Sequence, residues 1–326
     1  MRCVHWTITN GSGMHRVAEA LAKAETLLGG ESVLADPGLP ATWDAHVDAD
    51  VHIIHTHFPD ALARRVTKPL RLVWVGHGTP DHVFQSSVEA ALQGAYGHGD
   101  AIQLMLHWLK TAHAKVTFWP RHKWMYDRML TVGARKVDLV PLGVDTAFWG
   151  AGESAGKFAG EPSVLTCENP HYFKWPYDLL VAWIEIVRTF PEARLHCGYL
   201  PNDMHRAFFP FFNALGSSYT SYMSPTVFDK LNLRNALRST DFFCGLVRYG
   251  DLNHLSLEAT ATGAKTISYA GNPHATYWVR DGDQRELAEQ LTEIFRGNVP
   301  PRVVLPVPDI SATAAAMRAV YEDILP

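Results

Sequence analysis

The sequence predicts an α/β protein built from two similar domains, on three observations. Short apolar runs alternate with longer amphipathic segments, as in parallel strands joined by helices. The length of 326 residues suits two domains, because a domain holds about 150 residues. Residues 150–161 (GAGESAGKFAGE), near the middle of the chain, lack periodicity and are rich in glycine and alanine, which indicates a linker.

The first half contains five apolar runs that we expect to form strands, at residues 3–8, 51–55, 72–76, 116–119 and 137–141. Helices are expected between them, at residues 14–28, 60–66, 85–113 and 121–132. The first of these helices has an apolar period of about 3.6 residues, which places on one face Val17, Ala20, Leu21, Ala24 and Leu27.

The second half repeats the alternation of strands and helices. Strands are expected at residues 164–167, 195–199, 242–246 and 266–269. Helices are expected at residues 179–188, 227–238, 255–262 and 285–295. A last helix, residues 311–324, follows a proline-rich stretch.

Composition excludes several classes of protein. The net charge of −4 excludes a basic coat over the whole surface, although a local basic patch stays possible. No apolar run approaches the roughly 20 residues of a membrane span, and the N-terminus lacks the apolar stretch of a signal peptide. The four cysteines lie far apart, which argues against a zinc site or a disulfide framework. We therefore expect a cytoplasmic protein with no stable membrane association, and buried thiols at Cys3, Cys197 and Cys244.

Ligands of open α/β sheets bind beyond the carboxyl ends of the strands, so the loops after strands are the candidates for chemistry. Gly11, Ser12 and Gly13 follow the first strand and open the first helix. Glycines there let an anion approach the backbone and the helix N-terminus. A tight turn without a ligand is the alternative, because Arg16 stands where the dinucleotide fingerprint has its third glycine.

Histidines gather on and after the strand at residues 51–55, and His77 follows the next strand. Alternation along a strand sends His52 and His55 to opposite faces, whereas His55 and His57 share one. No acid or cysteine completes a metal-ligating set, so we predict no metal site and expect His52 to pack inside the fold. The Asp-x-Asp pairs at 48–50 and 281–283 do not lie at carboxyl ends of strands, so we expect them in turns and caps.

Two charged residues of the second half are candidates for binding a nucleotide. Lys174 precedes the helix at residues 179–188 and is placed to neutralise a diphosphate, although a solvated charge is the alternative. Glu258 lies on a short helix between two strands, among leucines and alanines. A carboxylate there is costly unless it accepts hydrogen bonds, for example from ribose hydroxyls, and the alternative is a surface glutamate.

In their order and spacing, these motifs resemble the family-four retaining glycosyltransferases of GT-B architecture, over nearly the whole chain. The most specific match is VDLVPLGVDTAFW at residues 137–149. Further matches, besides the glycine loop 11–13 and Lys174, are VHIIHTHFP (51–59), VWVGHG (73–78), DLLVAW (178–183), LHCGYLP (195–201) and LSLEATATGAKTIS (255–268).

The resemblance implies two Rossmann-like domains that face each other across a cleft. Residues 1–149 would form the acceptor domain and residues 162–310 the donor domain, joined by the linker 150–161, with residues 311–326 packing back on the first domain. The implied activity is metal-independent and retaining: a sugar passes from a nucleotide-sugar donor to a hydroxyl acceptor, and the departing phosphate helps to take the acceptor's proton. No cofactor or metal is implied, because protein cations and helix N-termini carry the charge of the leaving group.

The resemblance also assigns site residues. Glu258 matches a glutamate that hydrogen-bonds the ribose, Lys174 a diphosphate-binding lysine and His77 a histidine near the donor sugar. We expect these three to be the catalytic residues. The donor-binding residues would be Gly11, Ser12, Gly13, Arg248, Gly250, Asp251, Asn253, His254 and Leu255. The acceptor-binding residues would be His55, His57 and Thr79.

The sequence departs from the family pattern at two places. Gly250 stands where the family has the first glutamate of a pair, and Asp251 lies one place away. Glu168 stands where the family has a basic residue, so one cation for the diphosphate is missing unless Arg248 supplies it. A catalytically degenerate nucleotide-binding module is therefore an alternative.

A further alternative concerns the acceptor. Residues 253–258 (NHLSLE) resemble the DNA α-glucosyltransferases of T-even phages, whose acceptors are hydroxymethylated bases. Basic residues at 64–71 and 121–128, the latter near Trp119 and Trp124, would form a phosphate track, or else merely the exposed faces of two helices. The acceptor stays open between a saccharide, a small molecule and modified DNA.

Overall fold

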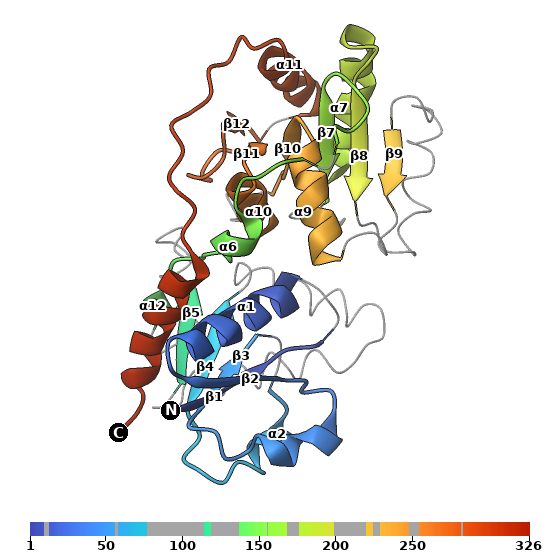
Figure 1. Ribbon diagram of the computed structural model, residues 1–326. Coiled ribbons are helices and arrows are strands. Elements are labelled where there is room, and N and C mark those ends of the chain that lie inside the picture. Colours follow the sequence, from blue (N-terminus) through green and yellow to red (C-terminus); the bar gives the residue numbers. More distant parts are fainter. Residues whose placement is uncertain are drawn as a thin grey trace. The chain divides into compact units, whose positions relative to one another are not determined.

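The computed structural model describes residues 1–9, 13–55, 58–76, 114–118, 137–154, 156–167, 176–198, 220–223, 229–247, 254–281 and 283–326. The chain divides into two units, of which the first comprises Met1–Asp145 with Pro308–Pro326 and the second comprises Thr146–Val307. Each unit is built on a six-stranded parallel sheet with helices packed on it (Figure 1). The predicted α/β class, with one parallel sheet in each half of the chain, is confirmed.

The first sheet has the strand order β2-β1-β3-β4-β5-β6. Its strands are β1 (Arg2–Trp6), β2 (Glu31–Ala35), β3 (Val51–Ile54), β4 (Leu72–Gly76), β5 (Ala114–Phe118) and β6 (Val137–Leu139). The described helices of this unit are α1 (Gly13–Leu27), the 3-10 helix η1 (Pro40–Ala45), α2 (Asp60–Ala63) and α12 (Ile310–Glu322).

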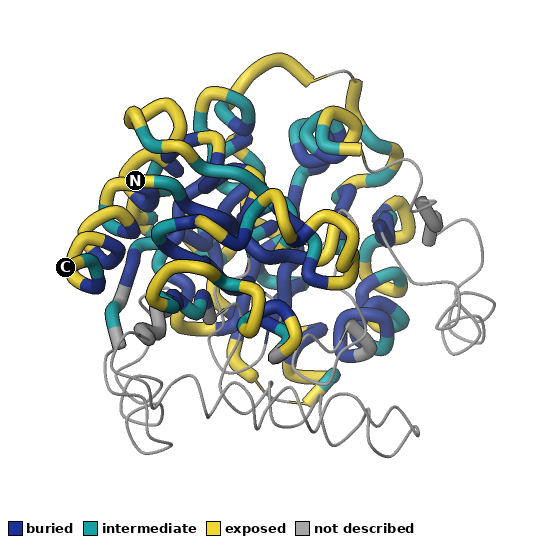
Figure 2. Tube along the Cα trace, turned by 90° about the horizontal axis from the view of Figure 1, so that it is seen from below, coloured by how far each residue is buried: buried dark blue, intermediate teal, exposed yellow. Residues whose placement is uncertain are grey.

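Alternation along β1 divides the first core between the two faces of the sheet. Trp6 pairs in register with Ile54 and packs with Phe58 on one face. The opposite face carries His5 and is covered by α1 and α12, which lie side by side (Figure 1). β1 is buried from Cys3 to Trp6 and β3 along its whole length. Figure 2 shows the buried residues inside and the exposed residues on the outside.

The inner face of α1 differs from the predicted one at its end. Leu27, predicted on the apolar face, is 79% exposed, because it is the last residue of the helix. Glu25 instead continues the buried row of Val17 and Leu21 at four-residue spacing. A carboxylate thus lies between the helix and the sheet.

The C-terminal segment joins the first unit through a close backbone contact. Val144 and Asp309 form a β-bridge, with hydrogen bonds from Val144 N to Pro308 O (3.0 Å) and from Ile310 N to Val144 O (2.8 Å). Asp309 also caps α12 by accepting from Ser311 N at 2.9 Å. A Cβ atom at Gly143 would lie 2.6 Å from Asp309 O, so only glycine fits at this crossing.

The second sheet has the strand order β12-β11-β10-β7-β8-β9. Its strands are β7 (Ser163–Thr166), β8 (Arg194–Gly198), β9 (Thr220–Met223), β10 (Phe242–Cys244), β11 (Lys265–Tyr269) and β12 (Tyr277–Val279). The described helices are α6 (Thr146–Trp149), α7 (Pro176–Thr189), α9 (Lys230–Ser239), α10 (His254–Ala261) and α11 (Gln284–Phe295).

Aromatic side chains join the helices of the second unit to its sheet. Trp183 on α7 and Phe295 on α11 have ring centroids 6.2 Å apart. Phe295 also packs on Phe242 of β10, at 5.0 Å between centroids. These contacts bury one face of the sheet under two helices.

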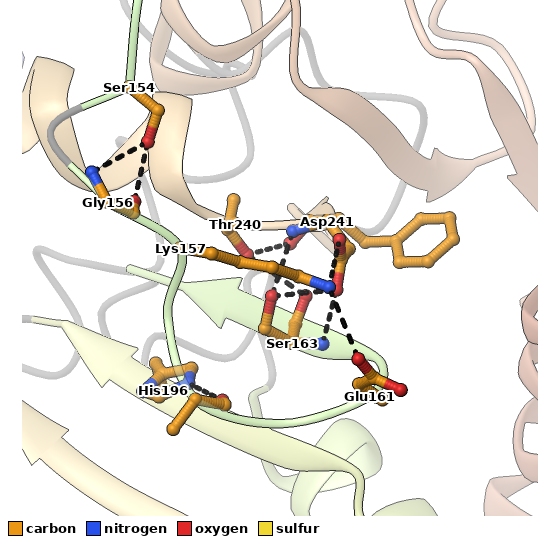
Figure 3. Close-up of polar contacts among 10 residues, drawn as sticks. Ser154, Gly156, Lys157, Glu161, Ser163, His196, Thr240 and Asp241 are labelled. Carbon is orange, nitrogen blue, oxygen red and sulfur yellow. Dashed lines mark hydrogen bonds and ion pairs between the residues drawn. The ribbon is translucent and has the colours of Figure 1, made fainter.

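Figure 3 shows how the segment before β7 is held at the amino ends of β7 and β10. Asp241 accepts hydrogen bonds from the amide and the hydroxyl of Ser163, both at 2.9 Å, and pairs with Lys157 at 3.4 Å. Thr240 donates to Ser163 O at 3.1 Å, and His196 contacts Ala159 O at 2.9 Å. The polar residues of this segment therefore have structural partners.

Three strands that the sequence did not predict, β2, β9 and β12, each lie at an edge of a sheet. The helices expected at 85–113 and 121–132 lie outside the described residues. Of the Asp-x-Asp pairs, Asp48 lies in a turn before β3 and Asp283 caps α11, as predicted. Asp50 instead accepts a hydrogen bond from Arg2 N (2.8 Å), 48 positions away. Buried thiols are confirmed at Cys3, Cys197 and Cys244. Among the described helices, none is both long and apolar enough to cross a bilayer.

Candidate functional site

Each sheet has one position at which its strand order reverses, and ligands of such sheets bind beside it, outside the carboxyl ends of the strands. In the first sheet the position lies between β1 and β3, because the chain runs from β1 to β2 on one side and then continues from β3 on the other. In the second sheet it lies between β7 and β10 for the same reason. The second order, β9-β8-β7-β10-β11-β12, is that of dinucleotide-binding domains.

In the second unit, the helix after β10 carries two of the predicted residues in contact. His254 begins α10, and its Nδ1 lies 3.1 Å from Oε1 of Glu258, one turn later. The side chains are 12% and 1% exposed. The distance suits an ion pair, although the directions of the two groups do not suit a hydrogen bond.

The sequence analysis left Glu258 open between a buried carboxylate that accepts hydrogen bonds and a surface glutamate. Glu258 is fully buried, which excludes the surface glutamate. Leu255, also predicted in the donor site, is buried beside it on α10. A carboxylate buried in this setting is costly unless partners satisfy it, and the imidazole of His254 lies within reach as one such partner. The contact of Glu258 with a ribose stays a prediction.

The other predicted donor residues of the second unit, Lys174, Arg248, Gly250, Asp251 and Asn253, lie outside the described residues. These residues lie in the connections from β7 to α7 and from β10 to α10, and β7 and β10 are the two strands at the reversal of strand order. β7 ends at Thr166 and α7 begins at Pro176, while β10 ends at Cys244 and α10 begins at His254. Both connections thus leave strands that flank the expected ligand position.

In the first unit, α1 begins at Gly13, as the glycine loop predicts. Gly11, Ser12, His57, His77 and Thr79 lie outside the described residues. Their roles in binding donor and acceptor therefore stay predictions.

Asp36, which follows β2, is a residue that the sequence analysis missed. Its Oδ2 accepts hydrogen bonds from the amide (3.0 Å) and the hydroxyl (2.9 Å) of Thr9, the last described residue before the glycine loop. Its Oδ1 accepts from Gly38 N at 2.8 Å. Asp36 thereby ties the chain after β1 to the chain after β2. An acidic residue about 20 residues after a glycine loop is the signal that would have identified it.

The predicted acceptor residue His55 directly follows β3 and is 3% exposed. Its Nε2 lies 2.9 Å from Nδ1 of His5, and Nε2 of His5 lies 2.9 Å from Oε2 of Glu25. Glu25 also accepts from Tyr321 Oη at 2.7 Å and from Ser32 Oγ. The sequence analysis did not anticipate this buried network, which joins β1, β2, β3, α1 and α12.

The contacts of this network keep the carboxyl group of Glu25 ionised. Burial raises the pKa of Glu25, but the positive charge of His5 and the hydrogen bonds from His5, Ser32 and Tyr321 together outweigh burial. The pKa of Glu25 is therefore held below its ordinary value, and the group is an anion at neutral pH.

His52 lies on the opposite face from His55, as strand alternation predicts. Trp6 Nε1 donates to Nδ1 of His52 at 3.1 Å, and the ring packs on Phe58. Burial lowers the pKa of His52 to about 4, so the ring is neutral at physiological pH. The prediction that His52 packs inside the fold is confirmed. Within the part of the chain that the structure describes, no three histidine, cysteine or acidic side chains gather into a possible metal site.

Comparisons with known proteins show likeness at the level of structure only. No protein-family model matches the sequence, and no curated protein shows significant sequence similarity. Sucrose-phosphate synthase from Thermosynechococcus elongatus has a TM-score of 0.74 at 14% identity, with 99% of each chain covered.

Two further solved structures are similar over almost their whole length. The Anabaena protein HepE, in complex with UDP-glucose, has a TM-score of 0.65 at 12% identity, with 99% of this chain and 98% of HepE covered. The trehalose-6-phosphate synthase OtsA has a TM-score of 0.66 at 11% identity, with 100% of both chains covered. These likenesses, together with the two doubly wound sheets, show that this chain has the fold of the GT-B glycosyltransferases.

Proposed function

We propose that the protein is a retaining glycosyltransferase that transfers a sugar from a nucleotide-sugar donor to a hydroxyl acceptor. The observation that carries the proposal is the buried Glu258–His254 pair on the helix that follows β10. The pair lies in a fold that this chain shares with a structure holding UDP-glucose. A carboxylate at this position is suited to accept hydrogen bonds from ribose hydroxyls.

In this proposal the second unit binds the donor. Lys174 and Arg248 neutralise the diphosphate, and the chain at Gly250, Asp251 and Asn253 faces the sugar. His77 from the first unit contacts the donor sugar, and the glycine loop faces the diphosphate. Amides and cations aimed at the developing charge make a metal unnecessary.

The first unit binds the acceptor through His55, His57 and Thr79. Of these, His55 is described, and it lies at the carboxyl end of β3, beside the reversal of strand order. The acceptor hydroxyl is accordingly proposed to approach the carboxyl edge of the first sheet.

The basic cluster at residues 64–71 gives little support to a DNA acceptor. Lys68 pairs with Asp50 at 2.6 Å, and Arg65 pairs with Asp44 at 3.1 Å. Their charges are thus partly neutralised within the protein, whereas a phosphate track needs cations that phosphates can reach. We therefore favour a saccharide or small-molecule acceptor.

The test of donor use is incubation with UDP-, GDP- and ADP-sugars, with and without EDTA. We expect release of free nucleotide from at least one donor, undiminished by EDTA. Glu258→Gln should lower this turnover, whereas Glu289→Gln, at an exposed glutamate of α11, should leave it unchanged. Absence of binding and hydrolysis with every donor would overturn the proposal, and loss of activity in EDTA would overturn metal independence.

The test of acceptor and stereochemistry uses labelled donor with a glycan panel, hydroxymethylated DNA and unmodified DNA. Proton NMR of the product reports whether the anomeric configuration of the donor is kept. Label in the hydroxymethylated DNA alone would favour the phage-type alternative over a saccharide acceptor. Turnover with any acceptor would exclude a degenerate binding module.

A further inference from the structure

A groove of about 320 Å³ lies in the second unit between β12 and α11, which are in contact (Figure 1). Trp278 lines it from β12, Glu293 and Ile294 line it from α11, and Val299 lines it from the chain after that helix. These residues lie within the described ranges 254–281 and 283–326. Ligand pockets have volumes of about 300–1,000 Å³, so the groove has room for a small ligand.

The groove lies apart from the proposed donor site. β12 is an edge strand of the second sheet, whereas the reversal of strand order lies between β10 and β7, beyond β11. Phe295, the last residue of α11, packs on Phe242, the first residue of β10, so the last turn of α11 lies near the amino ends of the strands. Ligands of such sheets bind at the opposite, carboxyl ends. A nucleotide-sugar donor therefore does not account for the groove.

Trp278 forms the aromatic wall of the groove and is held in one orientation. Its Nε1 donates to Asn272 O at 2.7 Å, and the guanidinium carbon of Arg302 lies over the ring, 3.3 Å from its centroid. Arg302 is itself held, because its side chain donates to Ala275 O at 3.2 Å and its amide to Thr276 O at 3.0 Å. Trp278 is nevertheless 38% exposed. An exposed aromatic side chain that is already fixed loses little conformational entropy when a ligand packs on it.

The carboxylate at the rim of the groove is fixed and ionised. Glu293 accepts hydrogen bonds from Asn298 Nδ2 at 2.7 Å and from Arg296 Nη1 at 2.8 Å. These bonds hold the pKa of Glu293 below its ordinary value, so the group is an anion at neutral pH. A carboxylate has about four lone-pair sites, so the two bonds leave Glu293 able to accept from a ligand as well.

An amide beside it supplies both kinds of hydrogen-bonding group. Gln290, which also lines the groove, accepts from Arg280 N at 2.8 Å and donates to Glu286 O at 3.2 Å. These bonds fix the orientation of the amide, and each uses only half of the capacity of its oxygen or nitrogen. The groove thus combines an aromatic wall with polar groups that can both donate and accept.

The charges around the groove favour a neutral ligand over a cation. A cation would stack on an indole that already has the guanidinium of Arg302 over its ring. The carboxylate of Glu293 also has a cationic partner, Arg296, at 2.8 Å. A pyranose ring is neutral and packs the C–H groups of one face on an aromatic ring. Its hydroxyls both donate and accept, which suits a carboxylate and an amide at the rim.

We infer that the groove between β12 and α11 is a saccharide-binding site, in which a sugar ring stacks on Trp278 and its hydroxyls bond to Glu293 and Gln290. The site needs no turnover, so saccharide binding here goes beyond the proposed function. Its use in catalysis rests on the proposed function: on a long glycan, occupancy of this groove raises the effective concentration of the acceptor hydroxyls of the same molecule.

The first experiment reads binding without activity. Protein labelled with ¹⁵N-tryptophan is titrated by NMR with maltohexaose, cellohexaose and N-acetylchitohexaose, and with hexalysine as the cationic probe. The indole N–H signal of Trp278 is assigned by its loss in Trp278→Phe. We expect at least one hexasaccharide to shift this signal in a saturable way, and hexalysine to leave it in place. A signal that no hexasaccharide shifts, or that hexalysine alone shifts, would overturn the inference.

Three variants test the stacking role by calorimetric titration with the same hexasaccharide. Trp278→Ala removes the aromatic wall and should weaken binding about tenfold. Trp278→Phe keeps an aromatic ring but not the bond to Asn272 O, so it should keep most of the affinity. Val303→Ala is the matched control and should bind as the wild type does, because this side chain is 95% exposed and outside the groove. Equal losses in Trp278→Ala and Trp278→Phe, or in Trp278→Ala and Val303→Ala, would overturn the stacking role.

The second experiment tests the use of the site in catalysis. For a glycan that accepts sugar, KM is measured with its hexasaccharide and with its disaccharide. KM should be lower for the hexasaccharide, and Trp278→Ala should shrink this difference about tenfold. An unchanged difference in Trp278→Ala would overturn the role in acceptor capture. Absence of sugar transfer to every glycan would instead count against the proposed function, while the NMR titration would still decide saccharide binding at Trp278.

Discussion

Substitution of Gly143 by alanine should detach the C-terminal segment from the first unit. The added Cβ would lie 2.6 Å from Asp309 O and 2.7 Å from both Asp309 C and Thr313 Oγ1. Carbon atoms pack at about 3.5–4.0 Å, so the segment must move by roughly 1 Å. Two of the three obstructing atoms belong to the backbone, which cannot turn away as a side chain would.

The cost follows from the hydrogen bonds that such a movement strains. They are the two backbone bonds between Val144 and the chain at 308–310, and the bond from Thr313 Oγ1 to Pro141 O at 2.8 Å. At about 0.5–1.5 kcal/mol each, loss of all three would lower the free energy of unfolding of the first unit by about 1.5–4.5 kcal/mol.

The assay is hydrogen–deuterium exchange of α12, combined with urea unfolding. Amide exchange in α12 should accelerate in Gly143→Ala, while exchange in α11 stays unchanged. Gly297→Ala is the control, because Gly297 has φ of +77° and no neighbouring atom within 4 Å of the added Cβ. The control adds backbone strain of about 1–2 kcal/mol without a clash and should leave α12 protected. Unchanged exchange of α12 in Gly143→Ala would refute the reasoning.

Three further outcomes are expected. Asp241→Ala removes two hydrogen bonds from Ser163 and should lower the stability of the second unit by about 2–3 kcal/mol, measured by urea unfolding; no loss would mean that these bonds contribute nothing. Because His52 has a pKa of about 4 when folded and about 6.5 when unfolded, the unfolded chain binds the proton between these values, so stability should fall by about 3 kcal/mol as pH drops through this range. His52→Gln should show a smaller fall in the same pH series, and an identical fall would contradict the assignment. In native protein at pH 8 a thiol reagent should label at most Cys167, whereas in denaturant it should label also Cys3, Cys197 and Cys244.

How well each strand could be predicted depended on where it lies in its sheet. β3 (VHII) and β7 (SVLT) are buried along their whole length, and neither contains an acidic residue, a lysine or an arginine. The missed strands β2, β9 and β12 are edge strands. β2 has an exposed first residue and three half-buried ones, and β12 is three residues long. Neither the length nor the pattern of these two distinguishes them from loops.

The residues of the candidate site that lie next to predicted strands could be predicted from the sequence. Those that are in contact only because distant segments pack together in the core could not. His55 and Glu258 could be identified from their places next to predicted strands. His5 and Glu25 could not, because their contacts join residues 20 and 50 positions apart. In the sequence, Glu25 is one more charge in an amphipathic helix, and its burial follows from the packing of α1 on the sheet.

The contact between Tyr321 and Glu25 also constrains the order in which the protein folds during its synthesis. The two residues are 296 positions apart, and the whole second unit is translated between them. At about 5–20 residues per second, the ribosome takes about 15–60 s to cover that distance. Throughout this interval the nascent first unit lacks both α12 and the phenol hydroxyl that satisfies its interior carboxylate. The second unit therefore emerges complete before the first unit can close, and the half of the protein that is made first is the last to mature.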